Sequence, residues 1–377
     1  MLTKGNTGGQ GLAACKRVSV WQTGYCLVRD ASTLARQTHI DVLKFTASQL
    51  IVLHHFSAYG PLADAMSDAA PKLVAWLYDY ARMAVQVFLV LGGYLAASSL
   101  APSGILRGGS PWRRVVQRYL RLALPFVAAM LLAVVSSMLA RRWLGADFIP
   151  DAPTWAQMLA HALLLHNVLG VDALSAGVWY VAIDFQLFAL ITGLLWLGRG
   201  SPHAARAGLL GLTLASLFFF NRDAGWDNWA LYFFGAYGLG AAAFWAGRST
   251  RPGWVSGLMG LIGLLALLFD FRERIALALG TALFLGFVQW RTQPATAPSP
   301  AKARAWISSV AGRLGQMSFA LFLVHFSVLM LGNALFERLE LADATSAGLV
   351  MLASWVACMG LALWFERWVE RPLSRLG

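Results

Sequence analysis

The sequence predicts an all-α fold: a polytopic integral membrane helix bundle of about ten transmembrane helices plus one re-entrant or interfacial helix. Of its 377 residues, 58% are hydrophobic and only 13% are charged, whereas soluble domains average about 25% charged residues. The mean hydropathy is +0.60. Apolar runs of membrane-spanning length recur along the chain, with basic residues gathered in the short segments between them. Lipid is therefore the expected solvent of most of this chain.

The N-terminal residues 1–38 contain no apolar stretch long enough for the core of a signal peptide. We expect them to form a cytoplasmic tail without a fixed fold, or to reflect an over-extended start codon. The membrane domain is expected at 39–372, and residues 373–377 form a short cytoplasmic C-terminal tail.

Ten stretches have the composition of membrane-crossing helices, which need roughly 20 mostly apolar residues. They are centred on 41–59, 81–100, 120–140, 178–197, 206–221, 229–246, 253–270, 274–290, 316–336 and 347–366. A further apolar run, Thr154–Leu169, is shorter and carries His161 and His166. We interpret it as the re-entrant or interfacial helix before the fourth span.

The basic residues test this count, because cytoplasmic loops of membrane proteins are enriched in Lys and Arg. With both termini placed in the cytoplasm, the inner segments hold 21 of the 30 lysines and arginines and the outer segments hold eight. The net charge of +12 is thus spread over many short loops. That distribution argues against a nucleic-acid partner, which needs one basic patch, and predicts a multi-pass protein with an even number of spans.

The first span is rich in polar residues, which are costly inside a membrane and are therefore candidates for function. Lys44 and His55 lie eleven residues apart, which is three helical turns, and Asp41 and Ser48 fall near the same stripe. We expect this stripe to face the bundle, with His54 pointing away. His55 is either a catalytic residue or a packing histidine bonded to a neighbouring helix.

The fourth and ninth spans each add one ionisable residue. Asp184 is expected at the same depth as His55, so the two could form a hydrogen-bonded acid–imidazole pair. The alternative is that Asp184 pairs with a structural arginine or a backbone group. His325 lies in the middle of the ninth span, where a lone histidine is more often structural than catalytic.

Four arginines lie at the expected cytoplasmic end of the third span. Arg114, Arg118 and Arg121 share one helix face by their spacing. One interpretation is anchoring by the positive-inside rule, and the other is a phosphate site, because guanidinium groups bind phosphates with two parallel hydrogen bonds.

The three cysteines, Cys15, Cys26 and Cys358, form no pair with metal-site spacing. We expect no metal and no disulfide framework.

Several of these segments together resemble the acyltransferase type 3 membrane family, which includes the O-acetyltransferases of bacterial surface glycans. Lys44 and His55 resemble the family's basic residue followed ten positions later by His, with Lys in place of the usual Arg. FLVLGGYL at 88–95, RYLRLALP at 118–125, WYVAIDFQLF at 179–188, SFALFLVHF at 318–326 and ERP at 370–372 resemble further family segments in the same order. Asp184 stands where the family usually has Glu.

The resemblance implies an enzyme of the bacterial cytoplasmic (inner) membrane that transfers an acyl group from cytoplasmic acyl-CoA to a hydroxyl. The acyl group is by default acetyl, and the acceptor is an envelope carbohydrate or a related molecule. His55 would be the catalytic residue and Arg118 and Arg121 essential elements. Trp179, Ser318 and His325 fall in the matching segments as substrate-binding or structural residues.

On this basis we expect His55 to act as the base, with Asp184 holding its tautomer. Lys44, Arg114, Arg118 and Arg121 would bind the CoA donor, whose arm could extend along the roughly 16 Å of helix between Lys44 and His55. The competing class is a non-enzymatic translocator or flippase for lipid-linked glycans. The acceptor itself stays open between a polysaccharide, peptidoglycan, a lipid and a small metabolite.

Overall fold

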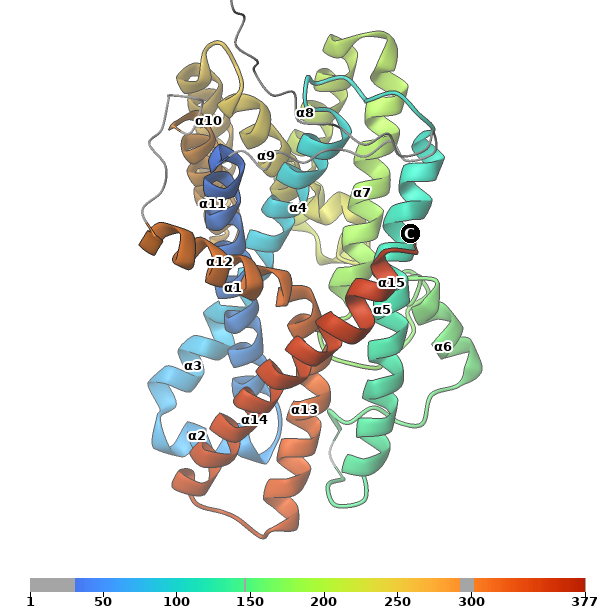
Figure 1. Cartoon of the computed structure of the whole chain (residues 1–377), viewed down its shortest axis with the longest axis vertical. Helices are drawn as coiled ribbons and strands as arrows, with labels where there is room; N and C mark the ends of the chain where they lie inside the picture. Colours follow the sequence, from blue (N-terminus) through green and yellow to red (C-terminus); the bar gives the residue numbers. More distant parts are fainter. Residues whose placement is uncertain (1–30, 146, 292–301, 377) are drawn as a thin grey trace, which may run out of the picture.

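The computed structural model describes residues 31–145, 147–291 and 302–376. Over these ranges the chain is almost entirely helical and contains no strand (Figure 1). The predicted all-α fold is confirmed. Most of the predicted N-terminal tail lies outside the described residues, but helix begins at Ala31, so residues 31–38 belong to the first helix.

Each of the ten predicted spans corresponds to one long helix. These are α1 (Ala31–Ala58), α4 (Val85–Leu100), α5 (Pro111–Ala140), α7 (Trp179–Leu197), α8 (Pro202–Phe218), α9 (Ala230–Gly247), α10 (Pro252–Phe269), α11 (Glu273–Arg291), α13 (Ser318–Arg338) and α14 (Ala344–Phe365). Within the described part of the chain, eight helical segments are long and apolar enough to cross a membrane. The helices α1 and α11 are not among these eight, because their polar residues lower the average hydropathy. The protein is a multi-pass helical membrane bundle.

The segments between the spans contain helices that the sequence did not predict. α2 (Pro61–Ala69) and α3 (Pro71–Tyr80) lie between the first two spans, and α12 (Lys302–Gln316) precedes α13. The α14 helix continues through a π-helical turn, Glu366–Glu370, into the short α15 (Arg371–Ser374).

The short helix predicted at Thr154–Leu169 is present but shorter, as α6 (Trp155–Ala162). It begins at a capping box, in which the Thr154 side chain accepts from the Gln157 backbone N–H and the Gln157 side chain accepts from the Thr154 N–H. It ends before Leu164, whose positive φ of 57° lies outside helical geometry. The remainder of the run is a chain of turns.

The helices form two groups along the long axis of the molecule. In Figure 1, α8, α9, α10 and α11 gather in the upper half, while α2, α3, α13 and α14 occupy the lower half. The long α5 runs along one side of both groups. The α13 helix packs against α1, α5 and α14, and α9 packs against α4, α8 and α11.

The small residues of the FLVLGGYL segment allow α4 and α9 to touch backbone to backbone. A Cβ added to Gly93 would lie 1.8 Å from the Tyr237 carbonyl oxygen, and one added to Gly240 would lie 1.9 Å from the Val90 carbonyl oxygen. Such close approaches are typical of helix packing in membranes. No hydrophobic effect drives helices together there, and small residues let the backbones come close enough for van der Waals packing. Both α4 and α9 also contact α7.

Candidate active site

His55 and His325 form a buried pair between α1 and α13. The Nδ1 atom of His55 lies 2.6 Å from Nε2 of His325. The two rings are nearly parallel, with centroids 4.9 Å apart and planes inclined by 10°. His55 is 7% exposed and His325 is fully buried. The polar stripe predicted on the first span therefore ends at this pair, inside the protein.

The hydrogen bonds assign the protons of both rings. Nδ1 of His325 lies 3.1 Å from the Leu321 carbonyl oxygen, which can only accept, so this nitrogen carries the proton. In the neutral ring Nε2 of His325 is then an acceptor, and Nδ1–H of His55 donates to it. Nε2 of His55 is left with its lone pair, and no described residue hydrogen-bonds to it.

The surroundings of His55 are largely aromatic. Tyr59 and Phe326 make edge contacts with its ring, at centroid distances of 5.7 and 6.2 Å. Gly177, just before α7, faces the same ring: a Cβ added there would lie 3.4 Å from Cε1 of His55 and from the Phe322 ring. The positive φ of Gly177, 80°, also favours glycine. The loop before α7 thus covers His55 at close range.

The expected pair of His55 and Asp184 is wrong. Oδ2 of Asp184 lies 2.5 Å from Nη2 of Arg118 instead, and the Asp184 carboxylate is 6% exposed. The α7 helix presents Asp184 to α5 rather than to α1, so the alternative of a pair with an arginine is the one that the structure shows. The hydrogen-bond partner of His55 is His325, a residue for which the sequence favoured a structural role.

Arg118, Arg114 and Arg121 do not share one hydrogen-bonded cluster. Arg118 contacts Asp184 and lies over the Phe188 ring at 5.4 Å, while its Nε is buried without a partner. Nη2 of Arg114 donates to the carbonyl oxygens of Arg107 and Gly108, at 2.9 and 2.6 Å. Arg121 is exposed. Only Arg118 points into the protein among these three.

The other residues of the polar stripe are also partly or fully enclosed. Ser48 is 1% exposed and donates to the Phe45 carbonyl oxygen at 2.8 Å. Lys44 is half-buried. Asp41 packs against Gly315 of α12. A Cβ added to Gly315 would lie 2.5 Å from the Cβ of Asp41. His54, expected to point away, lies 3.3 Å by its Nδ1 from the Leu77 carbonyl oxygen of α3.

Trp179 and Ser318 occupy the first positions of α7 and α13. The indole of Trp179 stacks on Phe233, with centroids 5.3 Å apart and planes inclined by 26°. Ser318 is 2% exposed and donates to the Leu314 carbonyl oxygen at 3.2 Å. Trp179 therefore packs on α9 through Phe233, and the Ser318 hydroxyl is engaged in the start of α13.

Among the described residues, no group of three or more His, Cys, Asp or Glu side chains is placed to hold a metal ion. Cys358 is buried beside the histidine pair, with its thiol 3.6 Å from the His325 carbonyl oxygen. Cys15 and Cys26 lie outside the described residues.

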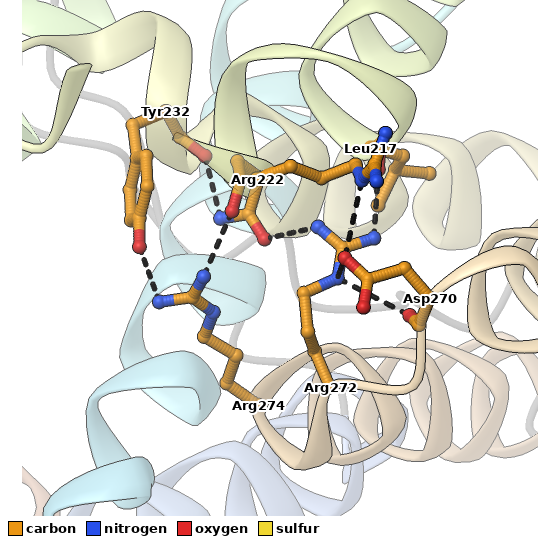
Figure 2. A network of polar contacts seen from close by, with 7 residues as sticks. Leu217, Arg222, Tyr232, Asp270, Arg272 and Arg274 are labelled. Carbon is orange, nitrogen blue, oxygen red and sulfur yellow. Dashed lines mark hydrogen bonds and ion pairs between the residues drawn. The ribbon is translucent and has the colours of Figure 1, made fainter. Parts of the chain in front are cut away.

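Sequence reasoning missed an arginine network at the start of α9 and the turn between α10 and α11. Figure 2 shows Arg272 and Arg274 converging on Tyr232 and Leu217, with Arg222 and Asp270 beside them. Arg272 donates to the Leu217 carbonyl oxygen and to Oδ1 of Asn221, both at 2.8 Å. Burial lowers the pKa of Arg272, an effect that Asp270 opposes and the charges of Arg274 and Arg222 reinforce. In the sequence these arginines contribute only to the number of basic residues in the outer segments, which predicts no binding site.

A family model described as an acyltransferase domain matches residues 38–366, most of the chain. The chain belongs to the acyltransferase type 3 family. No curated protein and no solved structure gives a significant match. The family assignment agrees with the helical membrane bundle seen here.

Membership in this family makes the protein a membrane acyltransferase. The match spans both halves of the site, since it includes His55 and His325 of the histidine pair as well as Arg118 and Asp184 of the ion pair. An acyltransferase needs a base for the acceptor and a place for an acyl donor, and these two buried pairs are the candidates within it.

Proposed function

We propose that this acyltransferase moves an acyl group, acetyl by default, from cytoplasmic acyl-CoA to a hydroxyl of an envelope carbohydrate or related acceptor. The observation that carries the proposal is the oriented imidazole of His55. Its Nδ1 is occupied by His325, so its Nε2 is the nitrogen available to a substrate. A fixed neutral imidazole is a suitable general base near neutral pH.

In the proposed reaction, Nε2 of His55 takes the proton of the acceptor hydroxyl as the oxygen attacks the thioester carbonyl carbon. A new C–O bond forms, and the C–S bond then breaks. The proton held on Nε2 passes to the departing CoA sulfur, which leaves as the thiol and returns His55 to its neutral form.

His325 would act as a positioning residue for this step. Its Nε2 accepts from His55, and its own Nδ1 is anchored on the Leu321 carbonyl. When His55 gains a proton on Nε2, the hydrogen bond from its Nδ1–H to His325 becomes charge-assisted and strengthens. The pair therefore stabilises the protonated form of His55 without a carboxylate. In Ser-His-Asp enzymes an Asp carboxylate stabilises the corresponding imidazolium.

The donor would bind through the basic residues of α1 and α5. Lys44, half-buried, and Arg118, with its unpartnered Nε, present positive charge toward the interior. Arg114, in the first turn of α5, and Arg121 would bind the phosphates of CoA. The aromatic contact of Tyr180 with Phe322, at 5.6 Å, links the neighbourhood of Asp184 to that of His55. We propose that the pantetheine arm follows this line.

The test is label transfer from radiolabelled acetyl-CoA by purified protein in detergent. His55→Ala should lower kcat by about 10²–10⁴-fold, the usual share of a general base. His325→Leu should lower kcat by about 10²-fold through misplacement of the imidazole, while His325→Gln, whose amide oxygen can accept from His55, should restore part of it. His203→Asn, which changes an exposed histidine, is the matched control and should leave kcat within about threefold.

Retained activity in His55→Ala would remove this residue from the chemistry. Equal rates for His325→Leu and His325→Gln would assign His325 to packing alone. If the wild-type protein neither binds acetyl-CoA nor releases CoA, the translocator of lipid-linked glycans becomes the better account.

A further inference from the structure

A polar cavity of about 700 Å³ lies where the starts of α4, α7, α9 and α11 come together. Its volume is within the range of roughly 300–1,000 Å³ that small-molecule sites occupy. It lies at the ends of these helices that the charge distribution places on the outer side. The mechanism proposed above gives this cavity no role.

Arginines from two distant segments meet in the wall of the cavity. Arg82, Arg272 and Arg274 line it, and within the described residues neither Arg82 nor Arg274 forms an ion pair. The acidic lining residues, Asp227 and Glu273, are exposed and likewise unpaired. Because Arg272 is paired with Asp270, Arg82 and Arg274 are the two arginines of the wall whose charge is available to a ligand.

The arginines are held in place before any ligand arrives. Arg274 donates to the Tyr232 hydroxyl and, at 2.8 Å, to the Asn221 carbonyl oxygen. These neutral partners orient the guanidinium but leave its charge uncompensated (Figure 2). Such preorganisation lowers the ordering cost of binding an anion, and guanidinium groups match carboxylate and phosphate oxygens in geometry.

A second and independent observation is Gln86 on α4. Its residue is only 5% exposed, it lines the cavity, and no described residue hydrogen-bonds to its amide. The amide therefore opens onto the cavity unpaired, where a ligand hydroxyl can both donate to it and accept from it. Across the cavity, the indole of Trp179, stacked on Phe233, offers a flat apolar face that suits the C–H face of a sugar ring.

We infer that this cavity binds the acceptor as a sugar carrying an anionic group, either a carboxylate or a phosphate. The inference rests on the proposed function and names its substrate class. The lining residue Trp179 is two residues from Gly177, which packs against the His55 ring. A sugar stacked on Trp179, with its anion on the arginines, would have a hydroxyl on the His55 side.

The test is calorimetric titration of the full-length protein in detergent, without any acyl donor. The probes are methyl glucuronide, glucose 1-phosphate, the neutral methyl glucoside and inorganic phosphate. We expect methyl glucuronide or glucose 1-phosphate to bind at least about tenfold more tightly than methyl glucoside at low salt, with the difference shrinking at high salt. The tighter of the two identifies the anion as carboxylate or phosphate.

Matched variants locate the binding. Arg82→Gln and Gln86→Leu should each weaken binding of the preferred anionic sugar by about tenfold, because each removes one contact of about 1.4 kcal/mol. Arg222→Gln is the control, since Arg222 belongs to the same network through Asp270 but does not line the cavity. Its affinity should stay within about twofold of wild type.

Equal affinity for the neutral glucoside, no binding of either anionic sugar, or an equal loss in Arg222→Gln would overturn the inference. Binding of inorganic phosphate as tight as that of glucose 1-phosphate would also overturn it, because the site would then recognise no sugar. Since no donor is present, the His55→Ala protein should bind the anionic sugar as wild type does. The catalytic proposal and the acceptor inference can therefore fail separately.

Discussion

Arg118 and Asp184 show how this bundle keeps a carboxylate in its interior. Asp184 is almost fully enclosed, whereas about a third of the Arg118 side chain, 34%, is exposed. An isolated buried carboxylate is very costly, and a paired one is tolerated. The ion pair therefore has a structural value for α5 and α7 that is separate from any role of Arg118 with the donor.

A double-mutant cycle separates these two roles. Arg118→Met should lower the free energy of unfolding by about 3 kcal/mol, the lower end for a broken buried pair, because Asp184 is left without its cation. Arg118→Met combined with Asp184→Leu should recover much of this loss, since no buried charge remains. Thermal unfolding in detergent measures both, and Arg121→Met, which changes an exposed arginine, is the control with little effect.

Two independent losses of stability, with no coupling between positions 118 and 184, would contradict the structural role of the pair. A recovered stability without recovered acetyl transfer would leave Arg118 with a function in donor binding beyond its ion pair.

At the scale of elements, α6 and the loop after it are held by two stacked histidines, His161 and His166. Their ring centroids are 4.2 Å apart. Nδ1 of His161 donates to the Gln157 carbonyl oxygen at 2.8 Å, and its Nε2 accepts from the Leu174 N–H at 3.2 Å. This arrangement requires a neutral His161. It ties α6 to the loop that carries Leu174 and Gly177.

The histidine stack makes stability depend on pH. Burial, reinforced by the charge of His161, lowers the pKa of His166 from 6.5 to about 4, and burial also lowers the pKa of His161. Because the folded pKa is depressed, this contribution is fully present above pH 6.5 and is lost as the pH falls from about 6.5 toward about 4. The slope is about 1.4 kcal/mol per pH unit for each histidine.

Melting temperatures of the full-length protein at pH 7, 5.5 and 4.5 check this dependence. His166→Leu should flatten the decline below pH 6.5 relative to wild type, whereas His203→Leu, which changes an exposed histidine, should leave it unchanged. Parallel declines for wild type and His166→Leu would assign the acid sensitivity to other groups.

The long helices could be predicted from the sequence, and the partners of their polar residues could not. Apolar length is a local property, so the ten spans followed from it. The hydrogen bond of His55 to His325 joins residues 270 positions apart, and depth alone could not choose between α13 and α7 as the neighbour of α1. The sequence therefore identified His55 and Asp184 as interior residues but assigned them to each other.

The missed helices and the missed cavity have a related cause. The segments that form α2, α3 and α12 are too short or too polar for a span, and they were interpreted as loops. The cavity arginines come from segments distant in sequence, at Arg82 and at Arg272–Arg274. Only the fold brings them together, so a count of loop charges could not reveal a binding wall.

At the scale of the whole molecule, the proposals depend on which ends of the helices face the cytoplasm. The alternating chain direction predicts that α5 starts on one side of the membrane and that α7 and α9 start on the other, while Arg118 of α5 contacts Asp184 of α7 inside the bundle. The excess of Lys and Arg in the segments on the donor side predicts that this side is cytoplasmic. A CoA donor and an envelope acceptor would then enter from the two sides that supply them.

Single cysteines on exposed loops test this orientation in cells. In a chain with Cys15 and Cys26 replaced by Ser and the buried Cys358 retained, Ser103→Cys marks the segment after α4 and Ala224→Cys marks the segment before α9. Both positions are exposed. A membrane-impermeant maleimide should label Ala224→Cys in spheroplasts and Ser103→Cys only after permeabilisation. The opposite pattern would place the cavity in the cytoplasm, and an envelope acceptor could then no longer reach it.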